Sequence, residues 1–134
     1  MNSFEIKISK KITLDVKKIT EWLQYTPYGH RITRREKDLL ASYIALYLEI
    51  WNSNKNPEEN KFIINSFVFG NYGNKIVREH VGISPEHAQV IKGKLVKTKC
   101  LVINEFGQYT LNKDIIPKIE ENGDIVVTVR IKLI

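Results

Sequence analysis

Two histidines and the single cysteine of the chain, His80, His87 and Cys100, are its nearest approach to a set of metal ligands. Zinc is held by such side chains, but in motifs that pair them at short, regular spacings. A predicted turn separates the two histidines, and Cys100 lies beyond the next predicted helix. The spacing therefore predicts no metal site, and one cysteine cannot form an internal disulfide.

Residues for catalysis are not arranged in a pattern that a known chemistry requires. The sequence has no glycine-rich phosphate loop, no nucleophile elbow and no pair of carboxylates placed together on one element. We expect a protein that is not an enzyme and that uses no cofactor or small-molecule substrate. It also lacks an apolar run of about 18 residues for a membrane span, and a signal-peptide core, so we expect synthesis in a cytoplasm without membrane contact.

Basic residues point instead to binding. The chain has 21 Lys and Arg against 15 Asp and Glu, a net charge of +6, which permits nucleic-acid binding without demanding it. Lysines can hold phosphates, and a glutamine can pair with adenine. The candidate contacts with DNA or with a protein partner lie on a predicted helix over 84–99 and at the start of an earlier helix: His87, Gln89, Lys92, Lys94, Lys97, Lys99, Arg34 and Arg35.

Acidic residues on the same predicted surfaces argue for a protein partner. Glu86 opens the helix over 84–99, and Glu105 lies at the tip of the hairpin predicted after it. A carboxylate that faces a phosphate is repelled, although Glu86 in a first turn also complements the helix dipole.

The stretch VGISPEHAQVIKGKLVKTKC, residues 81–100, predicts the second half of a helix-turn-helix. Gly82 suits a turn with positive φ, Ser84 is a good N-cap, and Pro85 is pre-organised for a first helical turn. A short helix over 74–81 comes before the turn, with Ile76, Val77 and either His80 or Val81 directed inward. In the helix after it, we expect the following residues to be buried: Ala88, Ile91 and Leu95. We expect these to face outward: Glu86, His87, Gln89, Val90, Lys92, Gly93, Lys94 and Lys97.

The other elements follow from hydrophobic periodicity and from turn residues. We predict a strand over 3–9, a helix over about 14–25 capped by Thr13, and a central helix over 34–51. The central helix begins with a capping box, in which the Thr33 hydroxyl accepts from a first-turn amide and the Glu36 carboxylate reaches back to the Thr33 amide. A loop over 52–60 comes next, and the apolar residues 61–70 that follow it fit a short helix or a strand, with a helix favoured, and end at the letters NYG. A hairpin of 101–104 with 108–111 and a strand from 125 to the end of the chain complete the sequence.

These elements predict an α+β fold, a winged helix-turn-helix domain with added N- and C-terminal β-strands. One domain spans residues 1–134. Residues 1–31 form an N-terminal strand and helix, residues 32–111 the helical core, helix-turn-helix and wing, and residues 112–134 a C-terminal strand extension. We expect the last strand to pair with the N-terminal strand or with an open sheet edge.

Two resemblances support this fold. ITRREKDLLA, residues 32–41, is similar to the start of LuxR-type DNA-binding domains. The stretches REKDLLA and GNKIVREHVGISPEHAQVIKGKLVKTKCLV with the short wing resemble MarR-like winged helices. They are closest to small helix-turn-helix proteins encoded near the virion genes of tailed, crAss-like phages of Bacteroidetes. Cys100 stands where that pattern has a glycine, so a different cap, or an earlier end of the helix, is expected.

The phage resemblance implies a structural or assembly protein of the virion, associated with the capsid or connector, made in the host cytoplasm and acting through contacts with other proteins or with copies of itself. The alternative is a cytoplasmic transcription regulator that places helix 84–99 in the major groove of double-stranded DNA. The acidic residues on the predicted contact surfaces favour the first interpretation.

Overall fold

The structure is a computed structural model, and it describes residue 12, residues 14–119 and residues 125–126. In order along the chain these residues form the following elements: α1 (Val16–Leu23), α2 (Arg34–Asn52), α3 (Lys61–Val68), α4 (Asn71–Val81), α5 (Pro85–Lys97), β1 (Leu101–Ile103), β2 (Tyr109–Leu111), a 3-10 helix (Lys113–Ile115), β3 (Lys118–Ile119) and β4 (Ile125–Val126). The described part is thus helical with small antiparallel β-pairs, which confirms the α+β class. The strand predicted over 3–9 lies outside the described residues.

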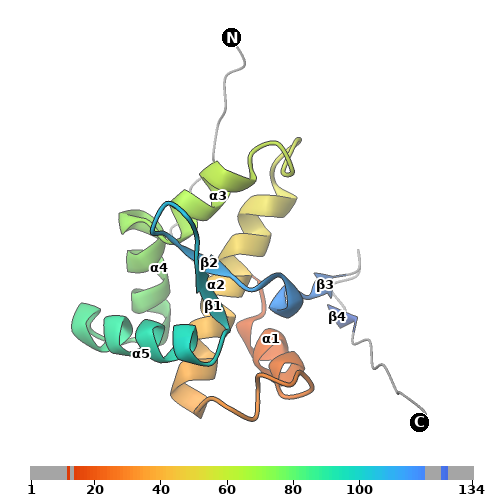
Figure 1. Ribbon diagram of the computed structural model, residues 1–134. Helices are drawn as coiled ribbons and strands as arrows, with labels where there is room; N and C mark the ends of the chain where they lie inside the picture. Colours follow the sequence, from red (N-terminus) through yellow and green to blue (C-terminus); the bar gives the residue numbers. More distant parts are fainter. Residues whose placement is uncertain (1–11, 13, 120–124, 127–134) are drawn as a thin grey trace.

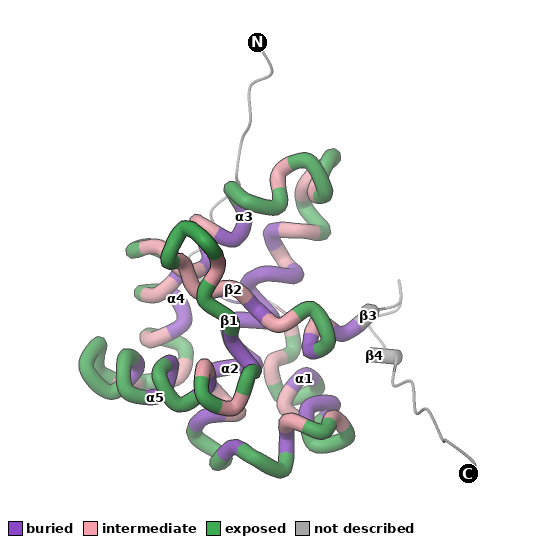
Figure 2. The backbone as a smooth tube through the Cα atoms, in the orientation of Figure 1, coloured by how far each residue is buried: buried purple, intermediate pink, exposed green. Residues whose placement is uncertain are grey.

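Helix α2 is the centre of the molecule, and the other helices pack around it (Figure 1). The sequence predicts one broad apolar stripe on α2, made of Leu39, Leu40, Tyr43, Ile44, Tyr47, Leu48 and Trp51. In the structure, however, residues 39–48 are buried on every side of the helix (Figure 2). Ala41, Ala45 and Leu46, which lie outside the predicted stripe, are at most 2% exposed. Four neighbouring helices cover α2, so apolar and small residues occupy its whole circumference.

The N-terminus of α2 is capped as predicted in one respect and differently in another. Thr33 Oγ1 accepts from the Glu36 amide at 3.2 Å, as expected for an N-cap. The buried Glu36 carboxylate, however, accepts from the Thr33 hydroxyl itself at 2.6 Å. The Thr33 hydroxyl therefore accepts a hydrogen bond from the Glu36 amide and donates one to the Glu36 carboxylate.

Helix α1 is shorter than predicted. Its N-cap is Asp15, whose carboxylate accepts from the Lys18 amide at 3.3 Å, so the prediction of Thr13 as cap is wrong. The helix ends at Leu23, before the loop that contains Gly29. A Cβ at Gly29 would lie 2.1 Å from the Leu23 carbonyl oxygen, so the chain turns back there against the end of the helix.

The break between α3 and α4 falls earlier than predicted. Gly70 caps α4, and the letters NYG, residues 71–73, form the first turn of α4 instead of ending α3. A Cβ on Gly73 would lie 2.1 Å from the Val68 carbonyl oxygen. Glycine at this position therefore permits the close approach of the two helices.

The β1–β2 hairpin is confirmed, with Leu101 opposite Leu111 and Ile103 opposite Tyr109. Gly107 has φ of 77° and closes the turn. Of the predicted C-terminal strand, Ile125 and Val126 are described, and they pair with residues 119 and 118. The pairing expected with the strand over 3–9 involves residues outside the described part. Residues 127–134 lie outside the described part of the chain.

Candidate binding surface

The turn between α4 and α5 is formed as the sequence predicts. Gly82 has φ of 79° and its amide donates to the Arg78 carbonyl at 2.7 Å, which ends α4 in a left-handed cap. Ser84 Oγ accepts from the His87 amide at 3.1 Å, and Pro85 begins α5. Ile76 and Val77 are buried, whereas His80 is exposed and Val81 is half-buried. Two helices joined by a three-residue turn therefore lie where the sequence placed them.

Helix α5 buries one face and leaves a long face free. Ala88, Ile91 and Leu95 are at most 3% exposed, as predicted. His87, Val90, Lys94 and Lys97 follow one another at steps of three and four residues, so they lie on one stripe, and all four are exposed. Glu86, Gln89 and Gly93 are exposed beside them. The Gln89 amide donates to the Tyr109 hydroxyl at 3.1 Å, which ties this side chain to the hairpin.

Lys92 is not an outward contact, and its prediction is wrong. It is 6% exposed, and its ammonium lies 5.0 Å from the centre of the Tyr109 ring and 3.5 Å from Asn74 Oδ1. Burial lowers the pKa of this ammonium, and the positive charge of Arg78 acts in the same direction. The reason is in the spacing, because Lys92 lies between Ala88 and Leu95 at steps of four and three residues, on the buried side of the helix.

The C-terminus of α5 ends on a lysine in the left-handed conformation. Lys99 has φ of 66°, the only positive φ outside glycine among the described residues. Its amide donates to the Val96 carbonyl, and the Cys100 amide donates to the Leu95 carbonyl. This pair of hydrogen bonds is the Schellman pattern, which usually has glycine at the left-handed position. The cap therefore differs from the family pattern, as expected, but Lys99 takes the place of the glycine and not Cys100. A residue with a Cβ pays roughly 1–2 kcal/mol for this conformation.

An arginine that the sequence reasoning missed lies near this helix end. Burial raises the pKa of the Cys100 thiol, the hydrogen bond with Thr98 lowers it, and the nearby charges of Glu36 and Arg31 raise and lower it respectively. Asn112 Nδ2 also bridges the Tyr28 hydroxyl, at 3.1 Å, and the Lys99 carbonyl, at 2.8 Å, so the loop before α2 lies against the end of α5. Only tertiary contacts bring these segments together, and no local pattern could have identified Arg31.

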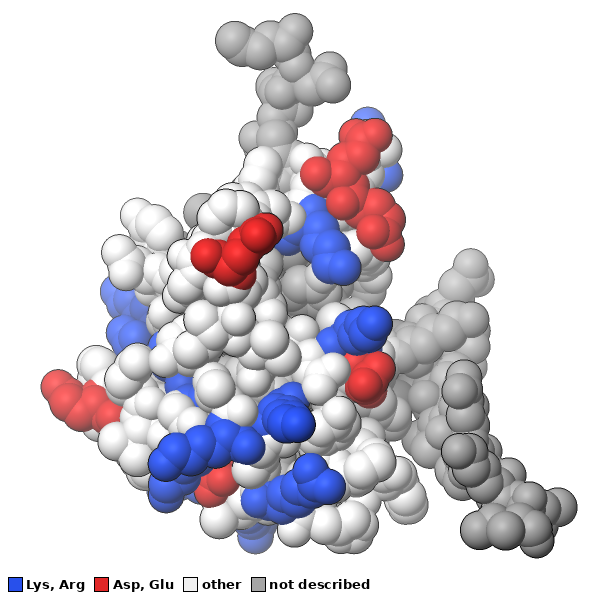
Figure 3. Space-filling model, in the orientation of Figure 1, with Lys and Arg blue, Asp and Glu red and all other residues white. Residues whose placement is uncertain are grey.

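We call Arg31, Lys94, Lys97 and Lys99 the basic patch. All four are exposed, and among the described residues none of them is paired with a carboxylate. Figure 3 shows Lys and Arg gathering where α5 ends and α2 begins. The patch is therefore a concentration of unpaired positive charge at one end of the exposed face of α5.

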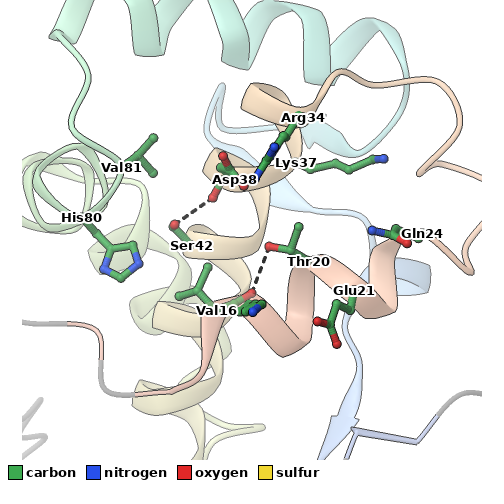
Figure 4. Close-up of a pocket in the computed structure, with 11 residues that line it drawn as sticks. Val16, Thr20, Glu21, Gln24, Arg34, Lys37, Asp38, Ser42, His80 and Val81 are labelled. Carbon is green, nitrogen blue, oxygen red and sulfur yellow. Dashed lines mark hydrogen bonds between the residues drawn. The ribbon is translucent and has the colours of Figure 1, made fainter.

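Arg34 and Arg35 lie in the first turn of α2, and both are exposed. Arg34 lines an open groove of about 680 Å³ between α1, α2 and the end of α4, which Figure 4 shows. Positive and negative side chains alternate around this groove, including Lys37, Asp38 and Glu21. Its polar groups are also used locally, since the Ser42 hydroxyl donates to the Asp38 carbonyl at 2.8 Å. The groove thus carries three cations against two carboxylates, and an excess of one charge does not select a ligand.

Gly93 lies in the middle of α5, where neither the backbone conformation nor a close neighbour requires glycine. A Cβ at this position would meet no atom within 4 Å, and the residue is exposed and helical. Alanine in an exposed helix interior is more stable than glycine by about 1 kcal/mol. Alanine at position 93, within the exposed face, and glycine at position 99, at its end, would therefore each be expected to give a more stable protein than the residue present.

Exposed apolar side chains gather at a different place, on α3 and the hairpin tip. Phe62 is 53% exposed and Phe106 is 66% exposed, and their rings meet edge to face at 5.4 Å. Gln108 Nε2 donates to Ser66 Oγ at 3.1 Å, and Asn65 Nδ2 to the Tyr109 carbonyl at 2.8 Å. The hairpin is thus folded onto α3, and its tip points away from α5 (Figure 1). Glu105 is an exposed residue of the turn at this tip.

The described residues contain no group of three or more His, Cys, Asp and Glu side chains that could hold a metal ion. His87 and Cys100 are held by different surroundings, since His87 is exposed and Cys100 is fully buried. None of the helices seen in this part of the chain has the length and apolarity needed to cross a membrane.

No known protein family, no curated protein and no solved structure matches this chain.

Proposed function

We propose that this protein is a non-enzymatic winged helix-turn-helix protein that binds double-stranded DNA through the exposed face of α5 and the basic patch. The observation that carries this proposal is the basic patch itself, four exposed cations without carboxylate partners at the end of a helix whose outer face is free. Phosphates of a duplex are the abundant polyanion that such a surface fits.

The arrangement supports binding to the DNA backbone more than reading of bases. With Lys92 buried and Gln89 bonded to Tyr109, the side chains left for base edges are His87, Val90 and the carboxylate Glu86. The stripe on α5 holds no arginine, the residue that most often reads guanine. We therefore propose that phosphate contacts supply most of the affinity and that sequence preference is weak.

A charge-matched pair of variants tests the proposal. The Lys94→Ala, Lys97→Ala, Lys99→Ala triple variant should weaken binding to a mixed-sequence duplex about thirtyfold, since exposed ionic contacts contribute on the order of 0.7 kcal/mol each. The control variant removes the same charge elsewhere, with Lys18, Lys55 and Lys61 changed to Ala. These three lysines are exposed on α1, on the α2–α3 loop and on α3. Fluorescence anisotropy at fixed salt measures both affinities.

Equal weakening by the two triple variants would show that net charge alone drives binding, and would refute the basic patch as the binding surface. Circular dichroism melting curves of both variants check that each remains folded. A wild-type protein without salt-sensitive affinity for duplex DNA would overturn the function itself.

A second function, a structural or assembly protein of a phage virion, is favoured by a separate observation. Phe62 and Phe106 form an exposed aromatic pair beside a groove of about 430 Å³ lined in part by Tyr47, Leu111 and Ile116. Exposed apolar surface of this kind is typical of protein contacts. Recovery of the protein in purified particles by mass spectrometry, together with absent duplex binding, would favour this function over the first.

A further inference from the structure

Two residues of the α5 surface, Gly93 and Lys99, should each lower the stability of the isolated protein. Among the described glycines, Gly82 and Gly107 have positive φ, and Gly29, Gly70 and Gly73 have backbone atoms where a Cβ would lie. Gly93 has neither, because its φ is that of an ordinary helix residue and the space around it is open. Lys99 shows the converse, since it has a side chain at a left-handed position that glycine would occupy without strain.

Both residues belong to the surface that we propose to bind DNA. Gly93 lies next to Lys94 and one helical turn before Lys97, and Lys99 follows two residues after Lys97. A missing Cβ lets another chain approach the helix backbone closely. A strained residue that local packing does not require indicates a role outside folding.

We infer that α5 contacts the duplex through its main chain at Gly93, and that Lys99 occupies a left-handed cap because its ammonium contacts a phosphate. This inference rests on the proposed function and specifies its geometry. The sugar-phosphate backbone lies against the helix at Gly93, where a Cβ would intervene, and the cations at 94, 97 and 99 meet phosphates around that point. The two residues thus trade stability for contact.

The test separates stability from affinity at each position. Gly93→Ala should raise the melting temperature by about 3–4 °C, because helix propensity improves in open space. The same variant should weaken duplex binding about tenfold, because the added methyl group overfills the contact. Ile63→Ala is the control, since this exposed residue of α3 lies outside the α5 surface and the change should leave duplex affinity as it is. Thermal melting and fluorescence anisotropy provide the two readouts.

Lys99 needs two substitutions. Lys99→Asn keeps a residue that tolerates the left-handed conformation and removes the charge, so the slope of log affinity against log salt should become less steep by about 0.9. Lys99→Arg keeps the charge and should leave that slope unchanged. The melting temperature of Lys99→Asn should be equal to or higher than that of the wild type.

The outcomes distinguish this inference from the proposed function. A wild-type protein that does not bind duplex DNA overturns both. A Gly93→Ala variant with a higher melting temperature and wild-type affinity overturns the contact of the duplex with the main chain at Gly93, but not the proposed function. A lower melting temperature for this variant also overturns that contact, because it would show that the glycine is needed for folding. A Lys99→Asn variant with an unchanged salt slope overturns the phosphate contact of Lys99.

Discussion

Lys92 shows how one side chain can be charged, buried and outside the binding surface. Its ammonium lies against the Tyr109 ring and near Asn74 Oδ1, but the bond to Asn74 is long, at 3.5 Å. Asn74 Oδ1 also accepts from the Tyr43 hydroxyl at 2.5 Å, so it keeps a partner without the lysine. The cost of burying the charge is therefore only partly offset by its contacts.

Lys92→Met should raise the free energy of unfolding by about 1 kcal/mol at neutral pH, because an apolar chain of similar length removes that cost. The lowered pKa of Lys92 fixes the pH dependence. The unfolded lysine binds its proton up to higher pH than the folded one, so wild-type stability rises as pH increases from the folded pKa towards the ordinary 10.5. The advantage of the variant should shrink over that range.

Urea unfolding of the wild type and of Lys92→Met, at neutral pH and at about pH 10, measures the difference between their free energies of unfolding. The two proteins expose nearly the same surface on unfolding, so their urea dependence should be the same and the midpoints can be compared directly. A variant less stable than the wild type by 1 kcal/mol or more would show that the ring and amide contacts outweigh desolvation.

Helices α2, α4 and α5 are joined at Asn74. Its Oδ1 accepts from Tyr43 of α2 and from Lys92 of α5, and its Nδ2 donates to the Phe69 carbonyl at 3.0 Å, at the end of α3. Tyr43 is fully buried and stacks on Phe69 at 4.7 Å. Burial raises the pKa of the Tyr43 hydroxyl well above its ordinary value, so this group remains a donor at all physiological pH values.

Asn74→Ala should lower the free energy of unfolding by about 2–3 kcal/mol, because it leaves a buried hydroxyl and a backbone carbonyl without partners. In a Tyr43→Phe background the same change should cost about 1 kcal/mol less, since the hydroxyl is already absent. Asn71→Ala, at an exposed position in the same helix, is the control and should change stability by no more than about 0.5 kcal/mol. Additive costs in the double variant would contradict a direct contribution of the Tyr43 bond.

Features that depend on neighbouring residues were predictable from the sequence. Gly82, Ser84 and Pro85 specified the turn before α5, and Thr33 specified the start of α2, because caps and turns use local backbone groups. Spacing also identified the buried face of α5, and the same spacing, followed through to Lys92, would have placed that residue on it. The hairpin was identified by its β-rich runs around Gly107.

Features that depend on tertiary contacts were not predictable. The hairpin folds onto α3 because Phe106 packs on Phe62 and Gln108 donates to Ser66, and the residues of each pair are far apart in sequence. This contact removes Glu105 from the α5 surface. Arg31 lies near the end of α5, where Asn112 bridges the loop before α2 and the Lys99 carbonyl. The acidic tip that favoured a protein partner in the sequence is thus not a part of the surface where the cations gather, whereas Glu86 remains exposed at the start of α5.

Across the whole molecule, the net charge of +6 is unevenly distributed. The basic patch lies at the junction of α5 and α2, whereas Glu58, Glu59 and Glu105 are exposed on the side of α3 and the hairpin tip. Lys55 and Lys61 are exposed on that same side, so cations and carboxylates nearly balance there among the described residues. A polyanion should therefore be attracted most strongly to the basic patch, which orients the encounter as well as strengthening it.

The salt dependence of duplex binding should report this distribution. Each phosphate neutralised on B-DNA contributes about −0.9 to the slope of log affinity against log salt, so four contacts from the basic patch predict a slope of about −3.6. Arg31→Ala alone should make the slope less steep by about 0.9, although this residue lies outside the helix-turn-helix, and Lys55→Ala should leave it unchanged. Anisotropy titrations at four or more salt concentrations measure the slopes. An Arg31→Ala slope equal to that of the wild type would confine the contact to α5 and remove the start of α2 from the DNA-binding surface.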